Sequence, residues 1–266
     1  MCYHSPKYTE KVLNMILEVC CGSAGDVFTA ARAGADRVEL NSALFLGGLT
    51  PSLGAMETAR RAGVPSMAMV RPREGGFCYS QAEFETMLLD ARRLLAAGAD
   101  GIVLAFLRPD GTVDTARCRA MLEVIGPHQS VFSRAMDVTP DWRAALDALI
   151  ELGVTRVLTS GQATTAPAGT AVLRAMVERA AGRIEILPGC GVRAGNALAL
   201  LEDTGCTQVH SSMRTWALDR SATHNPAVCF SGGVCPPEEQ IPVTDGDAVR
   251  TLADLLHRKQ GGPSAN

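Results

Sequence analysis

The sequence predicts a single-domain α/β fold, a (β/α)8 or TIM barrel, from a unit that recurs along the chain. In each unit a helical stretch ends at a glycine and an apolar strand begins shortly afterwards. A glycine there is typical of a helix C-cap, which needs a left-handed backbone. The seven glycines are Gly34, Gly63, Gly98, Gly126, Gly153, Gly182 and Gly205. Their spacing, from 23 residues (182 to 205) to 35 residues (63 to 98), accommodates one helix and one strand per unit.

One more strand, over residues 16–21, precedes the first helix and brings the number of strands to eight. The clearest later strands lie within residues 34–40, 98–104, 153–159 and 205–211. The alternative is a doubly wound parallel sheet. Such a sheet rarely has eight equal units, and no GxGxxG motif follows the first strand. The barrel is therefore the expected fold.

The segments between the strands have the pattern of helices. Residues 82–97 carry an apolar stripe with a period of about 3.6 residues. Thr50 and Pro51 have the form of an N-cap followed by proline at the first helical position. A last helix is expected near residues 248–258, after a Pro-, Gly- and Ser-rich stretch, residues 219–246, that we interpret as a long loop.

No linker divides the chain, so we expect one barrel domain over residues 16–260. Residues 1–15 would form an N-terminal extension. Residues 261–266 would form a disordered tail.

Composition argues against several classes of function. Hydrophobic residues make up 47% of the chain and charged residues 20%, so a sizeable core can form and intrinsic disorder is excluded. The net charge of −3 and the aromatic content of 5% argue against nucleic-acid binding. There is no run of about 18 apolar residues, so no membrane span is expected.

The nine cysteines favour free thiols in a reducing cytosol, because residues 1–14 are polar and lack the apolar stretch of a signal peptide. A cytoplasmic location is therefore expected. There is no CxxC motif and no Cys/His cluster with zinc-finger spacing, so a structural zinc site is not expected. Cys229 and Cys235, in the late loop, could clip that loop, bind a metal or do neither.

Polar side chains gather where the expected strands end, which is where barrel enzymes place their sites. Alternation along the strands directs Glu18, Cys20 and Glu39 into the barrel. A carboxylate inside a barrel is costly unless it is paired or hydrogen-bonded. Arg71 and His210 are the expected partners.

Two interpretations of these charges stay open. Glu18, Glu39 and Arg71 could form an ion-pair network that only fills a polar layer of the barrel. The functional interpretation rests on the polar residues that end at least five of the strands. His210 shares its strand end with two serines and could be either a satisfied core histidine or a site residue.

Gly189 and Gly191 follow the seventh strand, at a place where barrels often bind phosphate. Thr159 and Ser160, after the sixth strand, could donate hydrogen bonds to the same anion. The alternative is that the two glycines only make a tight turn.

Soft metal ligands are expected at the same end of the barrel. Cys20 and Cys21 are the candidate ligands, because thiolate sulfur suits Cu(I). Met69, Cys190 and His210 could approach them. The alternative is that a buried free cysteine packs as a small apolar residue.

Seven motifs stand in one order along the chain. They are LEVCC (17–21), GADRVEL (34–40), GGLTPSLG (47–54), RPR (71–73), FCYS (77–80), RVLTSGQ (156–162) and VHSS (209–212). Together they resemble the CutC copper-homeostasis family, and the similarity runs from Ile16 to Met213 with a weaker echo at residues 245–256.

The resemblance implies a cytosolic barrel protein, a homo-oligomer such as a dimer or tetramer, that is linked to copper homeostasis and is proposed to bind Cu(I). The family's interior polar residues correspond to Glu18, Cys20, Glu39, Arg71, Arg73, Arg134, Asp137 and His210. The chain departs from the family where it has Ser133 in place of a usual histidine, Asn41 in place of a frequent cysteine, and Glu74 and Gly76 in the loop after Arg73. The first two departures weaken a copper site or a general base at those positions.

Two functions therefore stay open. One is a Cu(I)-binding copper-homeostasis protein, with Cys20 and Cys21 as the metal ligands. The other is an enzyme that acts on a small anionic or sugar-like molecule, with Glu18 or Glu39 as general acid or base. Its catalytic candidates are Glu18, Glu39, Arg71, Arg134, Asp137 and His210, with Arg71 and Arg134 as the anion clamp. Its ligand- or anion-binding candidates are Arg73, Thr159, Ser160, Gly189, Gly191, Ser211 and Ser212.

Overall fold

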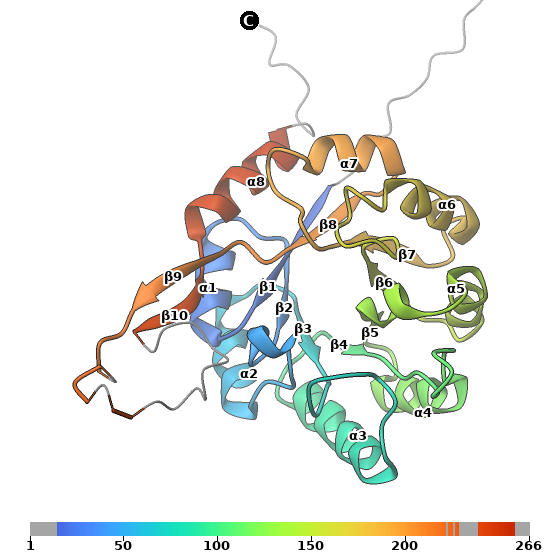
Figure 1. Ribbon diagram of the computed structural model, residues 1–266, viewed down its shortest axis with the longest axis horizontal. Coiled ribbons are helices and arrows are strands. Elements are labelled where there is room, and N and C mark those ends of the chain that lie inside the picture. The colour runs from blue at the N-terminus through green and yellow to red at the C-terminus, as the bar shows by residue number, and fades with distance from the viewer. Residues whose placement is uncertain (1–14, 222, 226, 229–238, 259–266) are drawn as a thin grey trace, which may run out of the picture.

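The computed structural model describes residues 15–221, 223–225, 227–228 and 239–258, and it confirms the expected barrel. The strands of the barrel are β1 (Ile16–Cys21), β2 (Arg37–Leu40), β3 (Ser66–Met69), β4 (Gly101–Leu104), β5 (Gln129–Phe132), β6 (Arg156–Thr159), β7 (Glu185–Pro188) and β8 (Gln208–Ser211). They form one parallel sheet in the order β7-β6-β5-β4-β3-β2-β1-β8. β7 and β8 lie side by side and close the ring (Figure 1).

Helices surround this ring (Figure 1). The α-helices are α1 (Ala24–Arg32), α2 (Leu53–Ala59), α3 (Gln81–Ala96), α4 (Thr115–Ile125), α5 (Trp142–Glu151), α6 (Thr170–Ala180), α7 (Ala197–Thr204) and α8 (Gly246–Arg258). The 3-10 helices are η1 (Leu44–Leu46), η2 (Arg60–Ala62) and η3 (Arg134–Val138). Among the described residues, none of the helices is both long enough and apolar enough to cross a membrane.

The seven repeat glycines end their helical units as expected. All of them adopt positive φ angles, between 58° and 101°. At Gly98 the constraint is also spatial, because a Cβ there would lie 2.5 Å from Cδ of Arg60. Any larger residue at this position would meet both a strained backbone and a clash.

Above its floor, the interior of the barrel is apolar on one side and polar on the other. Six buried side chains pack together inside it, and all of them come from β3 to β7: Met67, Met69, Val103, Val131, Leu158 and Leu187. The inward positions of β1, β2 and β8 carry Cys20, Glu39 and His210 instead. The polar site is therefore confined to the three adjacent strands β8, β1 and β2.

Below this site, polar side chains bridge the barrel floor. Arg156 pairs with Glu185, whose carboxylate also accepts a 3.2 Å hydrogen bond from Gln208. Gln208 in turn accepts a 2.8 Å hydrogen bond from Arg37. A polar layer therefore exists at the amino-terminal end of the barrel, but of the expected network of Glu18, Glu39 and Arg71 it contains neither Glu39 nor Arg71.

The late loop was only partly a loop. Residues 240–244 form β10 (Gln240–Thr244), which pairs antiparallel with β9 (Arg214–Leu218). The hairpin stands out from the barrel beside α1 (Figure 1). The Pro- and Gly-rich composition of this stretch predicted a loop, and β10 itself contains Pro242, so the strand was not expected. Cys229 and Cys235 lie outside the described residues, as do residues 1–14 of the expected extension and the expected tail 261–266.

The expected N-cap of the second helix was wrong. α2 begins at Leu53, and its N-cap is Ser52, whose hydroxyl accepts a hydrogen bond from the backbone N–H of Ala55. Thr50 is needed elsewhere. Its hydroxyl donates to the carbonyl of Arg71 and accepts from the Arg71 N–H, which ties the loop after β2 to the end of β3.

Candidate functional site

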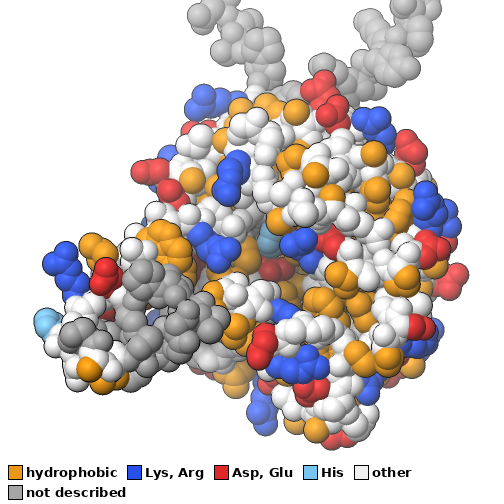
Figure 2. All heavy atoms as spheres, viewed as in Figure 1, with side chains coloured by type: hydrophobic (Ala, Val, Ile, Leu, Met, Phe, Trp, Pro, Cys, Tyr) orange, Lys and Arg blue, Asp and Glu red, His pale blue; other side chains and the backbone are white. Residues whose placement is uncertain are grey.

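A cavity of about 450 Å³ opens at the carboxyl ends of the strands. Figure 2 shows basic side chains around a hollow at the centre of this face. The charged or titratable side chains that line the cavity are Cys20, Glu39, Arg71, Arg134, Asp137, Cys190, Arg193, His210 and Arg214. Three more of the expected site residues line it as well: Gly191, Ser211 and Ser212.

Glu18 lies just below this cavity, between a guanidinium group and an imidazole ring. The strand register places it opposite Arg37 on β2 and His210 on β8. One carboxylate oxygen pairs with Nε of Arg37, and the other lies 2.7 Å from Nδ1 of His210. Burial alone would raise the pKa of Glu18, but the charge of Arg37 and the hydrogen bond with His210 outweigh it and lower the pKa to about 2. Glu18 is therefore a buried anion.

Two partners were expected for the inward carboxylates. The structure confirms the contact of His210 with Glu18, whereas the expected pairing of Arg71 with a carboxylate was wrong. Arg37 takes the place of Arg71, because it precedes Glu39 by two residues on β2 and so points to the same interior face.

His210 is buried, and its orientation is fixed by Glu18. Because Glu18 is ionised, Nδ1 of the imidazole donates the hydrogen bond, which leaves Nε2 free for the cavity. Burial alone would lower the pKa of His210, but the hydrogen bond to Glu18 and the charge of Glu39 raise it overall. The pair has the form seen in metalloproteins, in which a carboxylate orients a histidine ligand.

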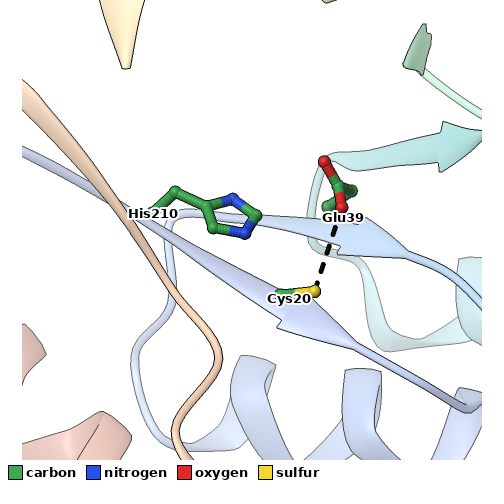
Figure 3. Close-up of side chains that lie close together, drawn as sticks. All are labelled: Cys20, Glu39 and His210. Carbon is green, nitrogen blue, oxygen red and sulfur yellow. Dashed lines mark hydrogen bonds between the residues drawn. The ribbon is translucent and has the colours of Figure 1, made fainter. Parts of the chain in front are cut away.

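Cys20, Glu39 and His210 converge above Glu18 from β1, β2 and β8 (Figure 3). One ligand atom of each, a sulfur, a carboxylate oxygen and a ring nitrogen, all lie within 4.8 Å of one another. The Cys20 thiol lies 3.9 Å from Oε1 of Glu39. Asn41 donates a 2.9 Å hydrogen bond to the same oxygen and so holds the carboxylate in place. This is the one cluster of three or more potential metal ligands in the described part of the chain.

The other carboxylate oxygen of Glu39 is unsatisfied. Oε2 is buried and has no hydrogen-bond partner among the described residues. Burial raises the pKa of Glu39, and the nearby charge of Glu18 raises it further. Burial and the charge of Glu39 likewise raise the pKa of the Cys20 thiol well above its usual value. An orphaned buried oxygen needs an explanation, and a bound cation or hydrogen-bond donor supplies one.

Arg71 points into loops rather than toward a carboxylate. Its guanidinium donates to the backbone carbonyls of Leu46, Gly48 and Gly75 at 2.7 to 3.2 Å. Its Nε is buried without a partner, and the guanidinium lies 5.2 Å from the ring centre of Phe77. β3 ends at Met69, before Arg71, so its side chain belongs to the rim of the cavity.

Asp137 closes the loop that follows β6. It accepts hydrogen bonds from the Thr159 hydroxyl at 2.6 Å and from the backbone N–H and hydroxyl of Ser160 at 2.9 Å. Arg134 pairs with it at 2.9 Å. Thr159 and Ser160 thus donate to a protein carboxylate, and neither lines the cavity.

Three other expected site residues also lie away from the cavity. Arg73 pairs with Glu83, which belongs to the capping box of α3. Cys21 is fully buried in the core between the barrel and the helices, so it does not join Cys20 in the cluster. Gly189 provides space instead, because a Cβ there would lie 2.7 Å from Leu158 and 3.4 Å from His210.

Sequence reasoning missed three charged residues near the site. Arg37 could have been found by extending the alternation of β2 by two residues. Arg193 and Arg214 line the cavity from the chain segments that follow β7 and β8. They stand two residues beyond Gly191 and Ser212, whereas the predicted site residues lie nearer to the strand ends.

Comparison with known proteins now identifies the family. A family model described as the CutC family matches residues 15–215. A Treponema denticola relative named family protein CutC is 48% identical over 244 residues, which cover 91% of this chain and 99% of that protein. The chain belongs to the CutC family.

Other CutC proteins support the same assignment. A human relative named copper homeostasis protein cutC homolog is 38% identical over 238 residues, which cover 89% of this chain and 87% of that protein. The crystal structure of a CutC protein from Streptococcus agalactiae is 32% identical, with a TM-score of 0.71 over 74% of this chain and 98% of that one. The CutC resemblance of the sequence motifs and the barrel are both confirmed.

Two of the three departures that the resemblance indicated, Asn41 and Ser133, can be followed in the structure of this CutC chain. Asn41 cannot supply a thiolate, and its amide instead orients Glu39 and lies 3.5 Å from the sulfur of Cys20. Ser133 lines the cavity, and its hydroxyl accepts a hydrogen bond from the N–H of Ala135 at the start of η3. The titratable groups that remain at the floor of the cavity are therefore Cys20, Glu39 and His210.

Proposed function

We propose that this protein takes part in copper homeostasis by binding Cu(I) at Cys20, Glu39 and His210. One observation carries the proposal: a thiol, an imidazole nitrogen and an orphaned carboxylate oxygen converge at the floor of a cavity that opens to solvent. The name of the human relative, copper homeostasis protein cutC homolog, points to the same metal.

The donor set fits copper. Thiolate and thioether sulfur favour Cu(I), and imidazole is a common copper ligand. Cys20 supplies the thiol and His210 the imidazole, while Met69 lines the same cavity with a thioether. Glu39 is the hardest of these ligands and the least suited to Cu(I). Its role is to balance the charge of the ion.

Binding of the metal must displace a proton. The pKa of the Cys20 thiol lies well above its usual value, so the thiol keeps its proton near neutral pH in the metal-free protein. Copper has to displace this proton before the sulfur can coordinate it. The charge of Arg214, which favours the Cys20 thiolate, assists this step.

We also propose a cytoplasmic location and a homo-oligomeric state, a dimer or a tetramer. Cys20, Cys21, Cys78, Cys118, Cys190 and Cys206 are free thiols, as a reducing compartment would keep them. Light scattering coupled to size-exclusion chromatography tests the assembly, and a mass of one chain, 28.0 kDa, would contradict it.

The copper proposal is tested by anaerobic titration of the reduced protein with Cu(I) in competition with a chromophoric chelator. We expect the wild type to bind one Cu(I) in the cavity. Cys20→Ser and His210→Ala should each weaken that binding by more than the about 10- to 100-fold typical of outer-shell changes.

The matched control is Cys78→Ser, which removes an exposed thiol that does not line the cavity. Its affinity should equal that of the wild type. Unchanged affinity in a Cys20/Cys21 double serine variant would overturn the proposal and move the metal elsewhere, with Cys190, Cys229 and Cys235 as the next candidates. A titration with Zn²⁺ shows whether the site selects copper.

A further inference from the structure

The cavity above the cysteine cluster is larger than a metal ion requires. Its volume of about 450 Å³ lies in the range of small-molecule sites, which span about 300–1,000 Å³. Four arginines line it: Arg71, Arg134, Arg193 and Arg214. Its acidic lining consists of Glu39 and Asp137, and Asp137 already pairs with Arg134.

The arginines that remain have no counter-ion. Among the described residues, the guanidinium groups of Arg193 and Arg214 make no ion pair and no hydrogen bond. Arg71 pairs with no carboxylate, and its partners are backbone carbonyls, the ring of Phe77 and the Tyr79 side chain. Three arginines without a counter-ion therefore line one cavity in a protein whose net charge is −3. A cleft lined by one sign of charge concentrates ligands of the opposite sign.

We propose that the barrel mouth binds a small organic anion: Arg71, Arg193 and Arg214 hold its phosphate or carboxylate group, and a hydroxyl of the same molecule reaches Glu39. Arginine suits the charged end of this ligand, because its planar fork of N–H donors matches the oxygens of either group. The inference stands on the cavity itself and does not depend on copper.

Two buried atoms, from two side chains that line the cavity, support this ligand. Nε of Arg71 is a donor without an acceptor, and Oε2 of Glu39 has no hydrogen-bond partner. Both side chains are more than nine-tenths buried and both line the cavity. A buried unsatisfied polar group is costly, so a ligand that carries an oxyanion at one end and a hydroxyl at the other would relieve both.

The rest of the lining limits the carbon skeleton. Leu44, Met69, Phe77 and Val138 supply apolar lining. A compound of a few carbons, with one charged group and one or more hydroxyl groups, fits this distribution. Phosphate monoesters and hydroxycarboxylates share that chemistry.

Calorimetric titration of the reduced, metal-free protein at low ionic strength distinguishes a phosphate monoester from a hydroxycarboxylate as the ligand. Inorganic phosphate and acetate probe the charged group alone, whereas glycerol 3-phosphate and glycerate add hydroxyl groups. We expect one of the hydroxylated compounds to bind at least about tenfold more tightly than its bare ion. The series that binds more tightly identifies the charged group. No binding of any of the four would overturn the inference.

The residue assignment is tested with Arg193→Met and Arg214→Met. Both side chains are exposed and without described contacts, so the variants should fold normally. Each should weaken binding of the hydroxylated compound by about tenfold or more, since each removes a charge-assisted contact. Arg250→Met, which removes an exposed arginine on α8 outside the cavity, is the control and should bind like the wild type. Equal affinity in all three variants would contradict the assignment.

Arg71→Met tests the rim residue that also holds the loops. Its thermal unfolding is measured first, because it loses three hydrogen bonds to carbonyls. If the variant does not fold, the affinities of Arg193→Met and Arg214→Met still show whether the arginines of the cavity bind the anion. Since the titration contains no metal, a failure of copper binding would leave its outcome untouched.

Discussion

Glu18 and His210 are joined by a 2.7 Å hydrogen bond between Oε1 and Nδ1, beneath the cavity of the barrel. The bond links the two layers of the barrel interior. Below it, Arg37 ties Glu18 into the polar floor, and above it Nε2 of His210 faces Cys20 and Glu39. The orientation of His210 therefore depends on a carboxylate that does not line the cavity.

Loss of Arg37 should destabilise the fold strongly. Arg37→Met leaves the buried carboxylate of Glu18 with His210 as its one remaining ionic partner. Breaking a buried pair from one side costs about 3–5 kcal/mol, and chemical denaturation measures the change. Arg250→Met, on the exposed face of α8, should change the free energy of unfolding by no more than about 0.5 kcal/mol. A similarly small effect in Arg37→Met would show that the pair is not needed.

Glu18 should make stability depend on acid pH. Its pKa falls from the ordinary 4.5 to about 2 on folding, so the unfolded chain binds the proton more readily. The stabilisation is present above pH 4.5 and is lost as the pH falls toward 2, by up to about 1.4 kcal/mol per pH unit. Glu18→Gln should flatten the curve of unfolding free energy against pH in that window. Parallel curves for the two proteins would contradict the pKa shift.

Glu18→Gln should also weaken copper binding without touching a ligand. Glutamine removes the charge that orients and polarises His210, and outer-shell changes of this kind cost about 10- to 100-fold in metal affinity. The Cu(I) competition titration measures the effect. Unaltered affinity would mean that His210 is held by other contacts.

Glu39 should lower the free energy of unfolding, although it contributes to copper binding. Its pKa is raised on folding, so above pH 4.5 the folded protein keeps a proton that the unfolded chain releases. The folded state is therefore disfavoured increasingly as the pH rises from 4.5 toward the folded pKa. Glu39→Gln should stabilise the protein at pH 8 by roughly 1 kcal/mol, and it should weaken copper binding. Lower stability in this variant would show that the carboxylate has a partner in solution.

The two adjacent cysteines should behave differently. Cys21→Ala removes a thiol from the core and should cost roughly 1 kcal/mol of stability while copper affinity stays unchanged. Cys20→Ser should weaken copper binding while the stability of the fold stays nearly unchanged. Equal losses of copper affinity in both variants would contradict the placement of Cys21 outside the cluster.

Local patterns predicted the ring and the inward side chains, because alternation within a strand is a property of the strand alone. Glu18, Cys20 and Glu39 follow from it, whereas His210 was found from its place at the end of a strand. Partners depend on the register between strands, which sets Glu18 against Arg37 and His210. No local pattern reports that register, so Arg71 was paired with the wrong residues.

Loop residues were harder to predict. Arg73 was expected near the anion, but the capping box of α3 places Glu83 within 2.5 Å of it. Asp137, a catalytic candidate, lines the cavity and also accepts hydrogen bonds from Thr159 and Ser160, which no local pattern indicated. In both cases the folded loops supply polar or charged partners for the side chain. Such partners become visible only once the loops are folded.

The position of copper in crystals tests the central claim most directly. Crystals of the reduced protein loaded with one equivalent of Cu(I), measured on both sides of the copper absorption edge, locate the ion by its anomalous difference. We predict one peak at the carboxyl ends of β1, β2 and β8, within bonding distance of Sγ of Cys20 and Nε2 of His210. A fully occupied copper peak elsewhere, with none at this cluster, would contradict the account.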